Sequence, residues 1–292
     1  PVTASAVATK DWAQALADIA VAVAQAKGVP APVAGGTAPA QAQAIAQALL
    51  AGERKAILLG NAAAHHGHAA QLLALAQWIG EQTGATVGYL TEAANTVGAQ
   101  WVQAQPQKDG KNAGEMLTGA IKAAILLNTE PAFDAAAGAK GLEQADMVIT
   151  LSPFKANLDI SDVLLPVAPF TETSGTFVNV EGRVQSFHAV VKPLGETRPA
   201  WKVLRVLANL LELPGFDYES SQDVLTAAIG AETKEVPSAL RSNITKVAAK
   251  VPENEAAEPV TASIYQLDGI VRRATSLQLT ADARLAREGG AA

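Results

Sequence analysis

A short stretch past the middle of the chain, residues 172–183, groups side chains that could hold a phosphate-bearing cofactor. It contains two carboxylates, one amide, one arginine and two glycines. The guanidinium of Arg183 has the fork geometry that binds a phosphate, or a carboxylate such as Glu172 or Glu181, through paired hydrogen bonds. On residue types alone we favour the carboxylate, in an internal ion pair that fixes a turn.

The same stretch predicts a local structure. Two segments with alternating apolar residues, 176–180 and 183–187, flank Gly182. A glycine between such segments is typical of a tight turn. We therefore predict a pair of strands joined at Gly182.

Three histidines, His65, His66 and His68, form a second candidate group ahead of a predicted helix. Imidazole nitrogens bind zinc, but a closed zinc site needs about four ligands and the chain has no thiol to offer. Helix capping or contact with a partner is the simpler explanation, so we predict no metal site.

Common catalytic motifs are absent from the sequence. There is no phosphate-loop lysine, and the turn after Leu59 reads Gly60-Asn61-Ala62, without the second glycine of a dinucleotide-binding turn. There is no serine nucleophile elbow and no cysteine. These absences disfavour nicotinamide-dependent enzymes and hydrolases of the serine and cysteine types.

The composition of the 292 residues is that of a globular protein with an acidic balance. Hydrophobic residues make up 49%, the net charge is −6 and no cysteine is present. Disulfides and locally bound iron–sulfur clusters are therefore excluded. The sequence has no basic stripe of the kind that indicates nucleic-acid binding. We expect the adjacent Arg272 and Arg273 to be solvated. No apolar stretch is long enough to span a bilayer and no signal peptide is visible, which predicts a cytoplasmic location.

Short apolar runs alternate with amphipathic segments along most of the chain. Strands are predicted at residues 56–59, 86–90, 123–128, 147–151 and 162–166. Helices are predicted at residues 11–27, 41–50, 68–82, 113–122, 134–144, 200–213 and 222–229. This alternation predicts an α/β fold, a doubly wound and mostly parallel sheet with helices on both faces, followed by an extended C-terminal tail.

The predicted domain organisation has three parts. Residues 1–52 form a helical segment and linker, residues 53–250 the α/β domain, and residues 251–292 a linker and tail. Since the chain opens on Pro1-Val2 and holds only two methionines, we expect it to be a piece of a longer protein.

Polar loops follow the predicted strands. Because the carboxyl ends of parallel strands meet at one edge, the loops 60–68, 91–99, 128–133 and 152–159 mark the default ligand site. A small-ligand binding module using Asn61, Asn95 and Asn128 is one hypothesis, although asparagines at strand ends more often cap loops.

The segment DVLLPVAPFTETSGTFVNVEGRVQ resembles the E-x-x-G-T-x-x-N-x-E-G-R-x-Q signature of the molybdopterin oxidoreductase family. The continuation VVKPLGETRPAWKVLRVLANLLEL, the segment that begins ILLGNAAAHHGHAAQLL, and VRRATSLQLTADAR are similar to one branch in particular. That branch is the G subunit of bacterial NADH:quinone oxidoreductase, respiratory complex I. The resemblance covers the chain from about residue 56 to its end.

The resemblance implies that this chain is a structural segment without catalytic activity of its own. It would belong to a subunit that supports electron transfer from NADH to quinone. The resemblance also implies that iron–sulfur clusters lie in an absent N-terminal part, and that this segment holds no cofactor and is not catalytic. The implied partners are the other peripheral-arm subunits, at the inner face of the bacterial plasma membrane without insertion into it. The apolar tail residues Ile264, Leu267, Ile270 and Val271 are a candidate docking strip.

Within this resemblance, seven residues correspond to a pterin-site signature that we interpret as vestigial. They are Glu172, Gly175, Thr176, Asn179, Glu181, Gly182 and Arg183. The alternative is a fragment of a true molybdopterin-dependent oxidoreductase, in which these residues line the pterin. Cofactor-bearing members carry a β-barrel domain after the α/β core, and the short segment after Pro259 favours the vestigial interpretation.

Overall fold

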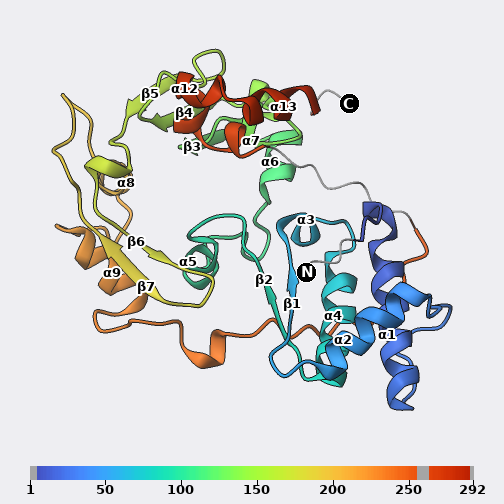
Figure 1. Cartoon of the computed structure of the whole chain (residues 1–292). Helices are drawn as coiled ribbons and strands as arrows, with labels where there is room; N and C mark the ends of the chain where they lie inside the picture. The colour runs from blue at the N-terminus through green and yellow to red at the C-terminus, as the bar shows by residue number, and fades with distance from the viewer. Residues whose placement is uncertain (1–4, 255–262, 290–292) are drawn as a thin grey trace. The chain divides into compact units, whose positions relative to one another are not determined.

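The computed structural model describes residues 5–254 and 263–289. The chain divides into two compact units (Figure 1). Unit 1 comprises Pro1–Ala94 with Pro237–Thr261, and unit 2 comprises Asn95–Val236 with Ala262–Ala292. Each unit contains its own parallel strands.

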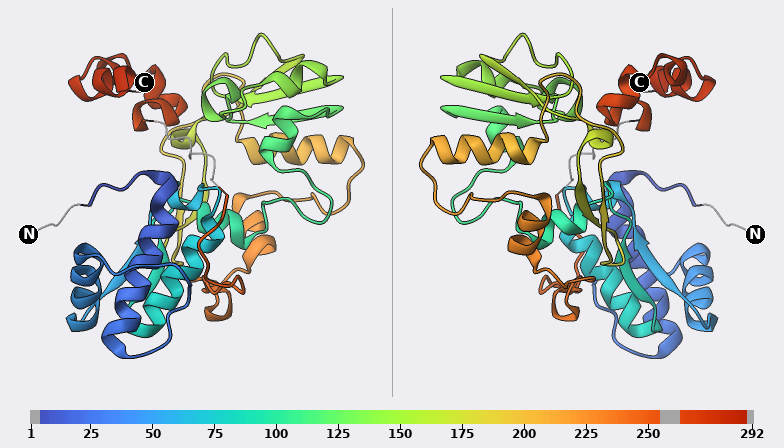
Figure 2. Two further views of the ribbon diagram at one scale, coloured as in Figure 1. Left: turned by 90° about the vertical axis from the view of Figure 1, so that its right-hand side faces the viewer. Right: turned by 90° about the vertical axis from the view of Figure 1, so that its left-hand side faces the viewer.

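Unit 1 is built on two parallel strands, β1 (Ala56–Leu59) and β2 (Thr86–Tyr89), with Ala56 beside Thr86. Its helical elements are η1 (Thr9–Asp11), α1 (Trp12–Lys27), α2 (Ala40–Ala51), α3 (Asn61–Ala64), α4 (Ala69–Thr83) and η4 (Ser238–Leu240). Helix α1 packs against both α2 and α4 (Figure 2). It ends at Gly28, whose left-handed backbone (φ 68°) suits a residue without a Cβ.

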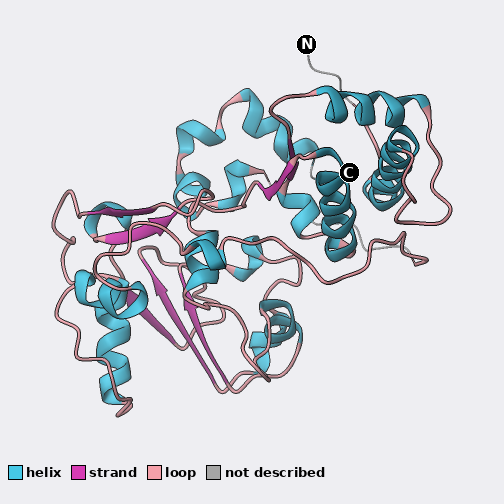
Figure 3. Ribbon diagram, turned by 90° about the horizontal axis from the view of Figure 1, so that it is seen from below, coloured by secondary structure: helices cyan, strands magenta, loops and turns pink. Residues whose placement is uncertain are grey.

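Unit 2 holds a three-stranded parallel sheet in the order β3 (Ala123–Leu127), β4 (Met147–Ser152) and β5 (Val163–Pro166). An antiparallel pair, β6 (Gly175–Val178) and β7 (Val184–Phe187), follows it. The helical elements before the tail are α5 (Thr96–Trp101), α6 (Ala113–Thr118), α7 (Pro131–Asp134), η2 (Lys140–Gln144), η3 (Phe170–Glu172), α8 (Ala200–Leu210) and α9 (Ser221–Ile229). Figure 3 shows the strands as short segments between helices and long loops. The predicted α/β class with parallel strands is confirmed.

Burial in the unit 2 sheet is uneven. A buried cluster forms where Leu126 and Val148 pack with Leu117 and Leu142. The alternate residues along the strands are more open, and Ile125 is 50% exposed. From the unbroken apolar runs in the sequence, we expect more complete burial of the strands. The described strands of unit 2 are less buried than this.

The C-terminal tail differs from the prediction. Instead of an extended segment, its described residues form four short helices. They are α10 (Ile264–Leu267), α11 (Gly269–Arg273), α12 (Thr275–Gln278) and α13 (Ala281–Gly289). Side-chain caps explain two of these helices, because Ser263 starts α10 and Asp268 starts α11.

Two predicted helices are also shorter than their sequence pattern indicates. The helix predicted at 134–144 is replaced by α7 and η2, because Gly138 between them takes a left-handed backbone (φ 63°) that an α-helix does not allow. The helix predicted at 113–122 ends at Thr118, where Gly119 turns to an extended backbone.

Candidate functional site

The signature segment forms the predicted hairpin of β6 and β7. The strands pair from Gly175 beside Phe187 to Val178 beside Val184. The side chain of Asn179 organises the turn, since its Oδ1 accepts hydrogen bonds from the backbone N–H groups of Glu181 (3.1 Å) and Arg183 (2.9 Å). Gly182 has φ 84°, so the predicted turn at this glycine is confirmed.

This geometry gives a direct test of the turn. Replacing Asn179 with alanine is expected to lower the free energy of unfolding by about 1–2 kcal/mol, because two backbone donors lose their acceptor. Asn179→Asp keeps an acceptor oxygen and is the matched control. Urea denaturation of both variants measures the difference, and equal stability of the alanine variant and wild type would show that the side chain does not hold the turn.

The predicted ion pair of Arg183 is not formed. Arg183 is exposed, and among the described residues it pairs with neither Glu172 nor Glu181. Its backbone instead bridges to Glu235. Hydrogen bonds to Asn179 therefore fix this turn in place of the expected ion pair.

The remaining signature residues line two cavities in unit 2. Gly175 and Thr176 border a cavity of about 270 Å³ that includes Trp101. Glu172 borders a second cavity of about 500 Å³, and its Oε2 accepts a hydrogen bond from the N–H of Leu194 (2.9 Å). The two cavities share Ser174, Trp201 and Ser221. The second also contains three cationic side chains, those of Lys192, Arg198 and Lys202.

A third cavity, of about 520 Å³, lies at the carboxyl ends of the unit 2 strands, and we call it the strand-end cavity. Asn128 follows β3, Ser152 ends β4, and Pro169 follows β5. Its aromatic lining consists of Phe154, Phe170, Phe177 and Phe187. Two of the predicted strand-end loops, 128–133 and 152–159, thus meet at one cavity, to which the hairpin contributes two rings.

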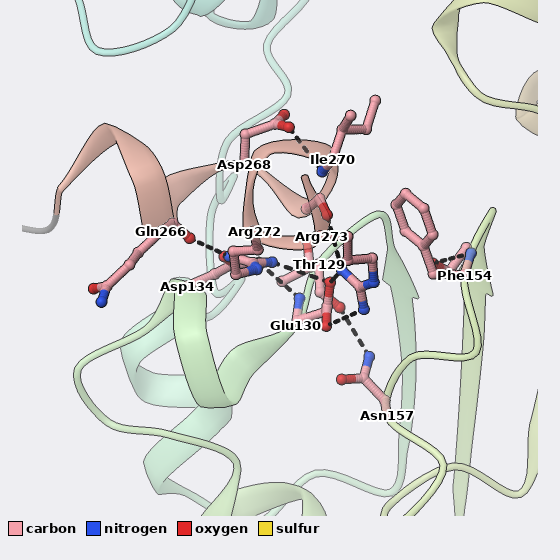
Figure 4. Close-up of polar contacts among 12 residues, drawn as sticks. Thr129, Glu130, Asp134, Phe154, Asn157, Gln266, Asp268, Ile270, Arg272 and Arg273 are labelled. Atoms are coloured by element: carbon pink, nitrogen blue, oxygen red, sulfur yellow. Dashed lines mark hydrogen bonds and ion pairs between the residues drawn. The ribbon is translucent and has the colours of Figure 1, made fainter. Parts of the chain in front are cut away.

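An acidic side chain at this edge is held by two arginines of the tail (Figure 4). The guanidinium of Arg273 donates to both oxygens of Glu130, from Nη1 to Oε1 (2.8 Å) and from Nη2 to Oε2 (2.9 Å). Arg272 donates from Nη2 to Glu130 Oε1 (3.0 Å) and from Nη1 to Asp134 Oδ1 (2.7 Å). The side chains of Glu130 and Arg272 are each 10% exposed. We call Glu130, Asp134, Arg272 and Arg273 the clasp.

The clasp corrects the expectation of solvation for Arg272, whereas Arg273 is ion-paired but stays 35% exposed. Each guanidinium also lies over an aromatic ring, Arg272 over Phe133 (4.9 Å) and Arg273 over Phe154 (4.2 Å). Sequence reasoning missed Glu130 as well, because its partners lie 142 and 143 positions away. The only local signal was the adjacent pair of arginines.

Hydrogen bonding controls ionisation in the clasp. The hydrogen bond from Arg273 lowers the pKa of Glu130, burial opposes this, and the bond from Arg272 lowers it further. Burial tends to lower the pKa of Arg272, but hydrogen bonds to Asp134 and Glu130 outweigh it and raise that pKa. Both partners are therefore charged at neutral pH.

The lowered pKa of Glu130 predicts an acid-sensitive tail. A carboxylate with a folded-state pKa below its unfolded value stabilises the fold above the unfolded pKa, and this contribution is lost as pH falls through the folded pKa. We expect the clasp to be intact at pH 7 and to weaken below the ordinary glutamate pKa of about 4.3. Hydrogen exchange of α11 across this range measures the effect. In a Glu130→Gln variant the pH dependence should largely disappear.

The ring nitrogens of His65 and His66 contact other groups of the protein. His65 Nε2 lies 2.6 Å from Glu92 Oε2. The buried ring of His66 lies 3.1 Å from the carbonyl of Thr9 through Nε2, and its Nδ1 accepts from the N–H of His68 (2.9 Å). Within residues 5–254 and 263–289, no group of three or more potential ligands is placed to hold a metal ion.

The three strand-end asparagines have different local surroundings within their own units. Asn128 borders the strand-end cavity, and Asn95 Oδ1 accepts a hydrogen bond from the N–H of Val178 (2.8 Å). Asn61 is the first residue of α3 in unit 1. Asn95 thus has a structural partner in the hairpin, whereas Asn128 remains a candidate ligand contact.

The α/β fold agrees with what sequence comparison finds. A family model described as Molybdopterin oxidoreductase matches residues 36–210. The chain belongs to the molybdopterin oxidoreductase family.

Curated relatives match a shorter part of the chain. It is similar to a protein of Staphylococcus aureus named "Putative formate dehydrogenase SAB2186c", with 39% identity over 77 residues, which is 26% of this chain and 8% of that protein. It is also similar to "Probable oxidoreductase YjgC" of Bacillus subtilis, with 40% identity over 70 residues, 24% of this chain and 7% of that protein. The matches thus span less than a tenth of these relatives.

In the described part of the chain, no helix is long and apolar enough to cross a membrane.

Proposed function

We propose that this chain is the α/β segment of a molybdopterin-dependent oxidoreductase and that unit 2 contacts part of the pterin cofactor. The observation that carries the proposal is the strand-end cavity. It lies at the carboxyl edge of a parallel sheet, where ligands bind in open α/β folds, and the signature hairpin contributes to its lining. Membership of the family and the names of the relatives support the proposal.

The chemistry of the lining fits such a cofactor. Planar heterocycles stack on aromatic rings, and the strand-end cavity has four phenylalanines with Asn128 and Ser152 as hydrogen-bonding groups. Phosphate groups bind cations and hydroxyls, and the cavity beside Glu172 has three cations together with Thr173 and Ser174. The volume of each cavity, about 500 Å³, is in the range of small-ligand sites.

The chain's own residues would bind and orient the cofactor. The cofactor, when bound, supplies the electron transfer to and from the substrate. Phe154, Phe177 and Phe187 would hold the ring system, and Lys192, Arg198 and Lys202 the phosphates. Glu172, Gly175 and Thr176 would shape the neighbouring walls, while Asn179, Glu181, Gly182 and Arg183 keep the hairpin in place. Because relatives are named as formate dehydrogenases, a small oxidisable acid such as formate is the proposed substrate class.

A second candidate function is favoured by the tail. Residues Asp268, Gly269 and Ile270 line the strand-end cavity, and the clasp fixes them there. This suits a cofactor-free structural segment of the G subunit of NADH:quinone oxidoreductase. In that case, iron–sulfur clusters elsewhere in the parent subunit carry the electrons. The partners would be other peripheral-arm subunits at the inner face of the plasma membrane.

One measurement separates the two candidates. The parent protein, purified whole, is analysed for molybdenum and tungsten and for the fluorescence of oxidised pterin. The first proposal predicts near-stoichiometric metal and pterin. It also predicts that a Lys192→Ala, Arg198→Ala, Lys202→Ala variant loses most of both, whereas a matched triple variant at the exposed Lys108, Lys111 and Lys246 does not. A folded parent protein that holds neither metal nor pterin would overturn the first proposal and favour the second.

A further inference from the structure

The tail covers the strand-end cavity at close range. Asp268, Gly269 and Ile270 belong to its lining. A Cβ built on Gly269 would lie 3.3 Å from Glu130 Oε1 and 3.6 Å from the ring of Phe154, so a larger residue would crowd the contact. The backbone of α11 therefore lies close to the side chains of Glu130 and Phe154 at this edge of the sheet.

Polar contacts tie the tail helices into one unit. Asp268 Oδ1 caps α11 by accepting from the N–H groups of Ile270 (2.8 Å) and Val271 (3.0 Å). The side-chain amide of Gln278 donates to the carbonyls of Tyr265 (2.9 Å) and Val271 (2.8 Å). These bonds connect α10, α11 and α12, so that the three helices would move together.

Apolar burial contributes little to holding this unit in place. Helices α10, α11 and α12 lie wholly in the described part of the chain, and none has a buried residue. Ile264 is 71% exposed and Leu267 45%. Docking therefore depends chiefly on the clasp, in which two guanidinium groups converge on one carboxylate (Figure 4).

We infer that residues 263–278 form a lid on the strand-end cavity, and that the clasp holds the lid closed. Charged hydrogen bonds close the lid, whereas an apolar interface would bury surface that is costly to expose again. Release of Arg272 and Arg273 from Glu130 would open the cavity without unfolding the sheet beneath it. The inference rests on the proposed function only for the identity of the ligand that enters.

The absence of cysteine gives a direct assay of lid opening. Ser152 is 5% exposed and lines the cavity, so Ser152→Cys places a single thiol beneath the lid. The rate at which a maleimide reagent labels this thiol is measured in the otherwise wild-type chain and with Arg272→Gln and Arg273→Gln added. The matched control adds Arg54→Gln and Arg284→Gln, which remove two exposed guanidinium groups outside the clasp.

If residues 263–278 form a lid, the thiol should be labelled at least about tenfold faster in the variant without the clasp arginines. A tenfold change corresponds to about 1.4 kcal/mol of lost closing free energy. The control should label at the wild-type rate. Hydrogen exchange of β4 and β5 must stay unchanged, and exchange of α11 must accelerate. Unchanged labelling with α11 released would show that the tail does not close the cavity. A protected α11 without its arginines would show that the clasp does not hold it.

Failure of the lid is distinguishable from failure of the proposed function. The assay contains no cofactor, so its result stands whether or not the parent protein carries molybdenum or tungsten. If the lid opens as inferred but the parent protein holds no cofactor, the lid would control the access of another ligand to the strand-end cavity.

Discussion

Replacing Glu130 with alanine is expected to lower the free energy of unfolding by about 3–5 kcal/mol, the usual cost of removing one partner of a buried ion pair. The substitution leaves two guanidinium groups without their carboxylate. Arg272 is the more affected, because its side chain is 10% exposed and its Nε already has no hydrogen-bond partner among the described residues. Asp134 alone would remain to neutralise it.

Undocking of α11 from the sheet would reduce this loss of stability. If α11 leaves the sheet, water can solvate both arginines, and the loss is limited to the docking free energy of the tail. Denaturation combined with hydrogen exchange of α11 separates the two outcomes. Glu143→Ala removes an exposed carboxylate from the same unit and is the control. If Glu130→Ala and Glu143→Ala had equal effects, the clasp would contribute nothing to stability.

The parallel strands and the hairpin could be predicted from local sequence because their causes are local. Short apolar runs fit strands at 56–59 and 147–151, and Gly182 supplies the positive φ that the turn requires. The break at Gly138 has an equally local cause, but the alanine-rich segment around it has strong helix propensity. Propensity predicted a continuous helix where a left-handed glycine interrupts it.

The clasp could not be predicted for a physical reason. A pair of adjacent arginines has the same composition on a solvated surface as in a buried ion pair. Only the fold brings Arg272 and Arg273 to Glu130 across more than 140 positions. The same holds for the ion pair predicted for Arg183, since the fork geometry of a guanidinium does not choose between nearby carboxylates. The side chain of Asn179 holds the turn by hydrogen bonds, where an ion pair of Arg183 was expected to hold it.

The signature in the sequence and the matching family model both point to the molybdopterin oxidoreductase family. Neither of them identifies one branch of that family. Part of the signature builds the hairpin of β6 and β7 in this chain, and that role does not depend on which ligand is bound. The residues that would discriminate lie outside that hairpin, in the cationic cavity and in the tail. Cations suit a cofactor with phosphates, and a lid that stays closed suits a segment without one. Cofactor content and lid opening therefore test different statements about the same edge of the sheet.

Replacing Leu151 with alanine is expected to cost about 2–5 kcal/mol, because Leu151 is fully buried in the central strand β4. Its register partner Leu127 lies beside it on the edge strand β3 but is 40% exposed. Leu127→Ala is the matched control and should cost less than about 1.5 kcal/mol, since a partly solvated side chain loses less transfer energy and leaves no closed cavity. Urea denaturation of both variants measures the contrast. Equal losses would mean that Leu127 is covered in solution by a surface that unit 2 alone does not provide, and would direct the search for partners to that face of the sheet.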